Sequence, residues 1–148
     1  MDEKFMQLAI EQAKIAKSTG DIPVGCVIIS KGKIVGVGYN TREKSKDPLG
    51  HAEINAIKMA AENIGDWRLD GCDLYVTLEP CPMCMGAIIN ARINAVIYGA
   101  NSKTYGCCGS LINLAAVDFP NRPKIKFGIL KSECEKLITN TNCFSNCE

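Results

Sequence analysis

Apolar runs typical of strands alternate with segments of helical period along almost the whole chain, and this alternation restricts the fold more than any other feature. We expect helices over residues 2–18, 51–63, 82–91 and 110–116, a final helix that begins at a capping-box pattern of Ser132 and Glu135, and strands over residues 24–30, 33–39, 73–78, 94–100 and 124–130. Residues 40–50 are polar and contain proline and glycine, so they are expected to form a loop. This order predicts an α/β protein whose helices cover both faces of one central sheet.

The connections between the strands predict a mixed sheet. Lys31-Gly32 is a tight-turn signal, and it joins the first two strands into an antiparallel hairpin. Helical segments separate the later strands, and crossovers of this kind join parallel neighbours. A length of 148 residues without a linker or a repeat further predicts a single domain over residues 1–148.

Nine cysteines against a single histidine are the unusual part of the composition. Their number is odd, and they are too sparse for a disulfide scaffold, which usually exceeds about 8–10% cysteine. The charged, amphipathic N-terminus lacks the apolar run of a signal peptide, and no apolar stretch reaches the roughly 18–20 residues of a membrane span. We therefore expect a cytoplasmic protein with reduced thiols and no membrane association. A net charge of +1 argues against a strongly basic nucleic-acid binder, so any basic surface is local.

Two short segments carry metal-binding chemistry. Pro80-Cys81-Pro82-Met83-Cys84 opens a predicted helix, and cysteines three residues apart in a first turn share one face. With His51 as a third ligand, they predict one zinc ion per chain with an open fourth position, the catalytic pattern. Water in such a position has its pKa lowered toward about 7. Within a helix, His51 and Glu53 would point about 200° apart, so His51 is expected at an irregular helix entry.

Two other interpretations of these segments are open on the residues alone. A Cys-x-x-Cys pair at a helix start could be a redox dithiol, although the neighbouring His51 and Glu53 disfavour this. A structural zinc site would need a fourth ligand, and it would leave Glu53 without a purpose. The candidates for that fourth ligand are Cys26, Cys72, Cys107 and Cys108.

At these residues the chain resembles the zinc-dependent nucleobase deaminases, whose signature is His-x-Glu followed by Pro-Cys-x-x-Cys. Within them it is similar to the bacterial tRNA-specific adenosine deaminases over nearly its whole length. The segments that carry this likeness are Ile22-Pro23-Val24-Gly25, Asn40, Asp47-Pro48, Tyr75-Val76-Thr77-Leu78-Glu79-Pro80-Cys81, Gly99-Ala100 and Gly109-Ser110-Leu111. The segment CPMCMGA at residues 81–87 would also suit a guanine deaminase.

The resemblance implies a three-layer α/β/α fold around a five-stranded mixed sheet, as in cytidine deaminases. It implies a homodimer that converts adenosine to inosine at the wobble position of a tRNA anticodon loop, without an organic cofactor. We expect the apolar helix face of Met83, Ile88 and Ile89 to contribute to the subunit contact. The first alternative is deamination of a free base or nucleoside, such as guanine or cytosine. The second, a non-enzymatic zinc-stabilised RNA-binding subunit, is disfavoured because such subunits lose the glutamate.

The resemblance also implies roles for individual residues. It assigns zinc binding to His51, Cys81 and Cys84, and it makes Glu53 the shuttle that takes a proton from water and passes protons to the ring nitrogen and the leaving amine. The residues implied to contact the base are Asn40, which hydrogen-bonds it, Val24 in the pocket wall, Ala52 through its backbone N–H, and Asn121. Taken as bare residues, an Asn at a strand end is often a turn residue and a Val is often plain core.

The likeness is incomplete where RNA would bind. Ser102 stands where an acidic RNA-contacting residue is common, and the segment from Leu137 to Glu148 has no Lys or Arg and keeps only Phe144 of the family's aromatic and basic ending. Phosphate affinity depends on cations. The candidates for phosphate contact are Lys31, Lys33, Arg42, Lys44, Lys46 and Lys103. No role follows from the sequence for Cys134, Cys143 and Cys147.

Overall fold

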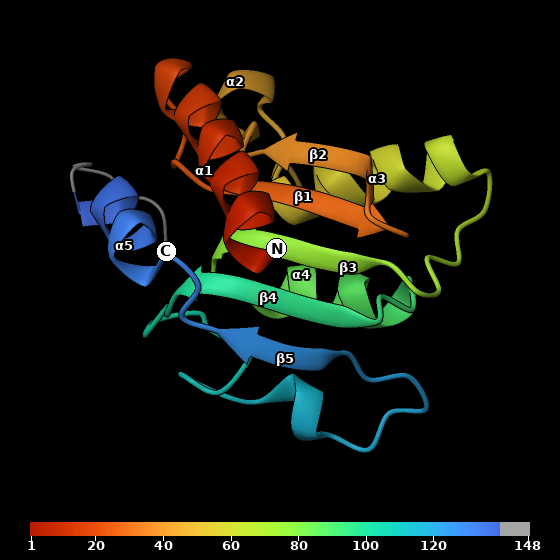
Figure 1. Cartoon of the computed structure of the whole chain (residues 1–148). Helices are drawn as coiled ribbons and strands as arrows, with labels where there is room; N and C mark the ends of the chain where they lie inside the picture. The colour runs from red at the N-terminus through yellow and green to blue at the C-terminus, as the bar shows by residue number, and fades with distance from the viewer. Residues whose placement is uncertain (140–148) are drawn as a thin grey trace.

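The computed structural model describes residues 1–139 and contains one five-stranded sheet with the strand order β2-β1-β3-β4-β5 (Figure 1). The strands are β1 (Gly25–Ser30), β2 (Lys33–Tyr39), β3 (Asp73–Leu78), β4 (Ala95–Ala100) and β5 (Lys124–Phe127). The helices are α1 (Asp2–Ser18), α2 (Arg42–Ser45), α3 (Ala52–Ile64), α4 (Pro82–Asn90), α5 (Lys131–Thr139) and the short 3₁₀ helix η1 (Leu114–Ala116).

The sheet is mixed, as the connections predict. β1 pairs antiparallel with both β2 and β3, whereas β3–β4 and β4–β5 are parallel. Lys31 and Gly32 both have positive φ angles, of 51° and 78°, which is the conformation that a two-residue hairpin turn requires. With these directions, the carboxyl ends of β2, β3, β4 and β5 and the amino end of β1 meet at one edge of the sheet, which we call the carboxyl edge.

Helices cover both faces of the sheet and create three layers, which confirms the predicted architecture (Figure 1). Side chains alternate along β1, so Cys26 and Ile28 face one core and Val27 and Ile29 face the other. The first core contains residues of α3 and α4, and the second contains residues of α1 and α5.

Small residues let α3 pack very close to β2. Ala52, Ala56 and Ala60 form a fully buried stripe along the helix, and they lie over glycines of the strand. A Cβ atom on Gly38 would be only 2.2 Å from the carbonyl oxygen of Ala52, so no larger residue fits there. This contact fixes the amino end of α3 at the carboxyl edge of the sheet.

The predicted loop over residues 40–50 contains the one-turn helix α2, and this part of the prediction was wrong. The buried Asp21 supplies the cap, because its carboxylate accepts hydrogen bonds from the backbone N–H groups of Glu43 at 2.8 Å and Lys44 at 3.1 Å. The acceptor comes from 22 residues away in sequence. The residues of the segment 40–50 alone therefore do not reveal this cap.

Three other elements differ from the sequence prediction by more than one residue at a boundary. β5 ends at Phe127 rather than at 130, because Gly128 and Leu130 take positive φ angles of 81° and 51° and turn the chain. η1 covers Leu114–Ala116 only, instead of 110–116. α5 begins at Lys131, so Ser132 lies inside its first turn and is not the N-cap.

No helix among residues 1–139 is long and apolar enough to cross a membrane. The expectations for Cys143, Phe144 and Cys147 lie outside the described residues, which end at 139. Cys134 belongs to α5 and is fully buried in the core that α1 and α5 form against the sheet. There it lies against Gly99, where an added Cβ would come within 2.3 Å of its Sγ, so its role is packing.

Asp2 ties the start of α1 to the sheet, and its replacement by asparagine is expected to lower the free energy of unfolding at pH 7 by about 1 kcal/mol. Its carboxylate accepts a hydrogen bond from Tyr75 Oη at 2.6 Å and pairs with Lys126. These partners lower the pKa of Asp2, with the Lys126 hydrogen bond first. A lowered pKa means that the contribution is complete above the unfolded value of about 3.9 and is lost as the pH falls through the folded value.

Thermal unfolding from pH 7 down to pH 2 checks this prediction. The difference in melting temperature between the wild type and Asp2→Asn should shrink toward zero below about pH 4. Glu3→Gln is the matched control, because Glu3 is exposed in the same helical turn and shares the helix dipole. An equal, pH-independent effect of both variants would show that the bonds of Asp2 do not stabilise the fold.

Candidate metal centre

Two helix starts at the carboxyl edge of the sheet bring the predicted metal ligands together. His51 is the N-cap of α3, with extended backbone angles of φ −90° and ψ 151°, and Cys81 is the N-cap of α4, with φ −79° and ψ 175°. His51 therefore lies at an irregular helix entry, as its spacing from Glu53 predicts. Pro82 follows Cys81 at the first helical position, where its missing N–H costs nothing.

The three ligand atoms are spaced as a tetrahedral zinc site requires. His51 Nδ1 lies 3.5 Å from Cys81 Sγ and 3.4 Å from Cys84 Sγ, and the three atoms all lie within 4.8 Å of one another. Bond lengths of about 2.3 Å to sulfur and 2.0–2.1 Å to nitrogen at tetrahedral angles give a nitrogen–sulfur separation of about 3.6 Å. The donors present therefore fit zinc in both chemistry and spacing.

The ligand set contains three residues and leaves a fourth position open. Among residues 1–139, no other histidine, cysteine or acidic residue joins the group of His51, Cys81 and Cys84. This argues against the structural-zinc interpretation, because none of its four candidate cysteines is close enough to be a fourth ligand. Glu53 is also outside the ligand set, which leaves its carboxylate available for proton transfer.

Burial and mutual hydrogen bonding set the charges of the site. The pKa of Cys81 is lowered to about 4, first by the hydrogen bond from Cys84 and then by that of His51. The Cys81 hydrogen bond raises the pKa of His51, and the hydrogen bond to Cys81 together with burial raises the pKa of Cys84. Glu53 is only 4% exposed, and burial followed by the charge of Cys81 raises its pKa to about 7.

We expect one zinc ion per chain, and we expect its binding to release protons. The Cys84 thiol keeps its proton without metal, and a cysteine must lose that proton to become a ligand. Metal analysis of the purified protein checks the zinc content. Proton release is measured by adding zinc, in a weak buffer, to protein whose metal a chelator has removed. Absence of zinc, or two tightly bound ions per chain, would contradict the site.

Three of the residues expected to contact the base lie beside the metal ligands. Asn40 directly follows β2 and is only 3% exposed, and its Oδ1 accepts a hydrogen bond from the backbone N–H of Ala52 at 2.9 Å. That N–H group, which we expected to serve the base, is thus used by Asn40. Val24 is 5% exposed and its carbonyl accepts the Asn40 N–H at 3.2 Å, so it packs in the core at the same edge.

Asn121 is not brought to the metal ligands within one chain. It is exposed in the segment between η1 and β5, and β5 begins beside Ala95, at the edge opposite to the ligands. Its contact with a substrate stays a prediction.

The helix face expected at a subunit contact is only partly accessible. Ile88 is fully buried in the core of its own chain, whereas Met83 and Ile89 are partly exposed.

The basic candidates for phosphate contact are separated by the fold. Lys31 and Lys33 lie at the hairpin turn of β1 and β2, which is at the edge opposite to the metal ligands. The candidates at the carboxyl edge, where the metal ligands lie, follow β2 or β4 and are Arg42, Lys44, Lys46 and Lys103. Only this second group is placed to contact a nucleic acid bound at the metal centre.

Glu79 is a site residue that sequence reasoning missed. It directly follows β3 and precedes Cys81 by two residues, is 2% exposed, and accepts hydrogen bonds from the backbone N–H groups of Ser102, Cys108 and Ser110. Ser102 is itself 4% exposed, so it does not occupy the surface position expected for an RNA-contacting residue. The available signal was an acidic residue placed directly between a buried strand and the Pro-Cys pair.

Zinc-dependent nucleobase deaminases hold their metal with this combination of one histidine and two cysteines, beside a glutamate that is not a ligand. Residues 1–100 match the family described as the cytidine and deoxycytidylate deaminase zinc-binding region, and this chain belongs to that family.

Relatives within the family are more specific. The chain is 40% identical over 139 residues to the tRNA-specific adenosine deaminase of Bacillus subtilis (strain 168), with 93% of this chain and 86% of that protein covered. A structure from a study of A-to-I editing by tRNA:A34 deaminases at the wobble position is 36% identical, covers 90% of this chain and 98% of that chain, and has a TM-score of 0.87. The guanine deaminase of Bacillus subtilis is 34% identical, with 80% and 86% covered and a TM-score of 0.64.

Proposed function

We propose that this protein deaminates adenosine to inosine at the wobble position of a tRNA anticodon. The observation that carries the chemistry is the buried Glu53 carboxylate beside a three-ligand metal centre with an open position. The substrate follows from the relatives, because the structure of the tRNA:A34 deaminase study superimposes over more of the chain, and with a higher TM-score, than the guanine deaminase does.

Each site residue then has one task. His51, Cys81 and Cys84 would hold a zinc ion, which when bound would supply Lewis acidity to a water molecule. Glu53 accepts a proton from the water that adds to C6 of adenine, and it delivers protons to the ring nitrogen and the departing amino group, so water is consumed and ammonia released. Burial raises the pKa of this carboxyl, and a raised pKa suits a group that both accepts and donates a proton.

Asn40 and Val24 orient the base. Because Asn40 Oδ1 is held by the Ala52 N–H, its amide nitrogen is the donor that faces a bound base. Val24 supplies an apolar wall at the same edge. The reaction needs no organic cofactor, since its only co-substrate is water.

One comparison of substrates tests this function. Purified protein is incubated separately with a tRNA transcript that carries adenosine at position 34, with guanine, with cytosine and with cytidine, and inosine and ammonia are measured. We expect inosine from the tRNA and no ammonia from the small molecules. Ammonia from guanine alone would instead identify the protein as a guanine deaminase, the candidate that the 34% identity to a guanine deaminase favours.

We also propose that the protein is a homodimer. Met83 and Ile89 are partly exposed near the site, and Leu111 and Ile112 are 56% and 48% exposed in the segment after β4. A contiguous patch of such exposed apolar residues would be typical of a protein contact. Sedimentation at micromolar concentration should give twice the 16.0 kDa chain mass, and a monomer would refute the proposal.

We place the reaction in the cytoplasm and assign it to a single domain over residues 1–148. All seven cysteines among residues 1–139 are free thiols, as expected in a reducing compartment.

A further inference from the structure

The buried Glu79 carboxylate is the centre of a hydrogen-bond cluster that no step of the deamination uses. Its Oε2 accepts the backbone N–H groups of Cys108 at 2.9 Å and Ser110 at 3.1 Å. Its Oε1 accepts the N–H of Ser102 at 3.1 Å, the amide of Asn101 at 3.4 Å, and the Ser110 hydroxyl. All five donors belong to one segment, residues 101–110, which we call the site loop.

A carboxylate is the group that this set of donors requires. Burying a carboxylate costs several kcal/mol unless charge-assisted hydrogen bonds offset the loss of water. A glutamine at the same place would turn an NH₂ group toward donors and leave at least one of them unpaired. A glutamate at this position therefore matches the donors of the site loop and holds the loop in one conformation.

The site loop is also pressed against the metal centre. The N–H of Cys107 donates to the carbonyl of Pro80 at 2.9 Å, directly before the ligand Cys81. Gly106 lies against the Glu79 carboxyl, where an added Cβ would be 2.6 Å from Oε1. The distance from this loop to the metal ligands is thus fixed by backbone contacts.

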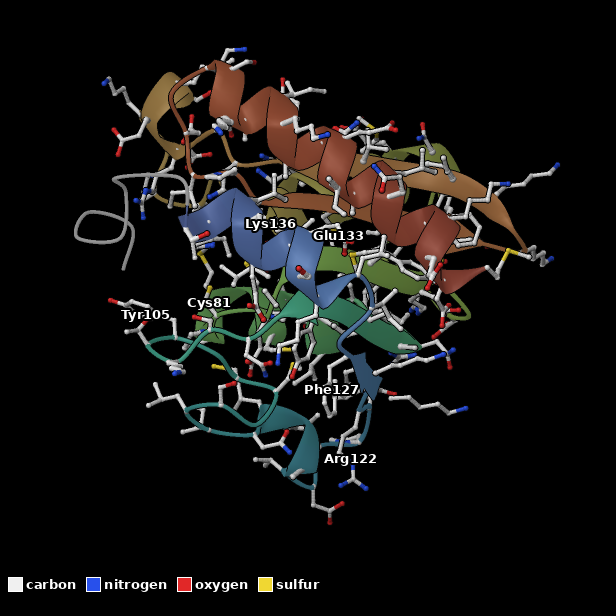
Figure 2. All side chains as sticks on the ribbon, turned by 60° about the vertical axis from the view of Figure 1, so that its left-hand side comes forward. Cys81, Tyr105, Arg122, Phe127, Glu133 and Lys136 are labelled. Atoms are coloured by element: carbon white, nitrogen blue, oxygen red, sulfur yellow. The ribbon has the colours of Figure 1, made fainter. Side chains whose placement is uncertain are left out.

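Tyr105 is the one aromatic residue of the site loop, and it is exposed. The residue is 43% exposed, although the backbone on both sides is bound: its N–H donates to Ser102 Oγ at 3.3 Å, and its carbonyl accepts from Cys107 Sγ at 3.3 Å. Figure 2 shows Tyr105 and Cys81 on the same side of the molecule. An aromatic ring with a fixed backbone loses little entropy on binding, and such rings stack on unpaired bases.

We propose that Glu79 is a positioning residue that holds the site loop in place, and that the loop thereby presents Tyr105 as a stacking surface for an RNA base next to the deaminated adenosine. This inference rests on the proposed function, because a free base or nucleoside has no neighbouring base to stack. It makes Tyr105 a determinant of RNA binding and gives it no part in proton transfer.

The first test measures RNA binding. An anticodon stem-loop hairpin with adenosine at the wobble position is titrated with wild type, Tyr105→Phe, Tyr105→Ala and Trp67→Ala at one salt concentration. Trp67 is the matched control, since it is 51% exposed and lies beyond the far end of α3. We expect about a tenfold weaker affinity for Tyr105→Ala, because stacking on an aromatic ring is worth about 1–3 kcal/mol per base. Wild-type affinity is expected for the other two variants.

The kinetics separate stacking from general damage. Tyr105→Ala should raise KM for the hairpin by about the same factor as Kd, with kcat within about threefold of the wild type. Unchanged affinity of Tyr105→Ala, or an equal loss in Trp67→Ala, would overturn the role of Tyr105.

The second test examines Glu79 without a substrate. Cys107 and Cys108 are 0% and 8% exposed, so a displaced site loop should expose their thiols to an alkylating reagent, mapped by mass spectrometry. We expect faster alkylation of both in Glu79→Gln, with zinc still bound. Gly106→Ala should do the same, because its added Cβ collides with the Ser102 carbonyl oxygen and with the Glu79 carboxyl. Protected thiols in both variants would overturn the positioning role.

A double variant links the two parts, and the measurements also separate this inference from the proposed function. Once Glu79→Gln has released the loop, adding Tyr105→Ala should weaken RNA binding by less than about twofold. Full additivity of the two effects would refute the link between Glu79 and Tyr105.

A wild type that binds the hairpin but forms no inosine would refute the deamination, while the affinities still decide on Tyr105. A wild type that does not bind the hairpin would overturn the role of Tyr105, while alkylation still decides on Glu79.

Discussion

Replacing Glu53 with alanine is expected to lower the rate of deamination at least about a thousandfold while zinc stays bound and the fold persists. Glu53 is outside the ligand group, so its removal leaves the three metal ligands in place. General acid–base catalysis is worth roughly 10²–10⁴-fold per group, and this single carboxyl serves several proton transfers. The loss of a negative charge at the start of α3 costs only about 0.3–1 kcal/mol of stability.

Two further variants make this result specific. Glu53→Gln keeps the shape of the side chain but cannot accept the proton, so it should be as inactive as the alanine variant. Glu62→Ala removes an exposed carboxylate from the same helix and should retain wild-type activity. Inosine formation from the tRNA transcript and zinc content are measured on the same preparations. More than a tenth of the wild-type rate in zinc-loaded Glu53→Ala would show that the mechanism is wrong.

Local patterns sufficed for the main elements of the fold and failed where a distant residue decides the structure. The strand over residues 73–78 follows from a short apolar run and the helix over 2–18 from the helical spacing of its apolar residues, and the structure has both with the same bounds. α2 was missed because its cap comes from Asp21, a residue that precedes both strands of the hairpin. β5 was predicted too long because the chain turns at Gly128 and Leu130, and the positive φ angle at Leu130 is one that a leucine rarely adopts.

The same distinction separates the site residues. His51, Cys81 and Cys84 could be predicted because ligand chemistry dictates both their types and their spacing. The role of Glu79 could not be predicted, because its partners lie 22 to 31 residues further along the chain and are mostly backbone groups. The only sequence signal was its place between a buried strand and the Pro-Cys pair. The lysines show another limit of the sequence, since Lys31 is as basic as Lys46 and only the strand directions place them at opposite edges of the sheet.

Removing a metal ligand is expected to have a different effect from removing Glu53. His51→Ala and Cys84→Ala should lose their zinc, all measurable deamination and much of their stability, because metal that binds only the folded state stabilises it. At a free zinc concentration 1,000 times the dissociation constant, this stabilisation is about 4 kcal/mol. For a chain of this size, each kcal/mol shifts the melting temperature by about 2–4 °C, so we expect a decrease of roughly 10 °C.

A chelator supplies an internal control for this prediction. EDTA should lower the melting temperature of the wild type to that of His51→Ala and should leave the variant itself unchanged, because the variant has no zinc to lose. Cys134→Ala is the matched cysteine control: Cys134 is fully buried but lies in the other core, so this variant should keep its zinc and its response to EDTA. Full zinc content in His51→Ala, or an EDTA response equal to that of the wild type, would mean that the metal is held elsewhere in the chain.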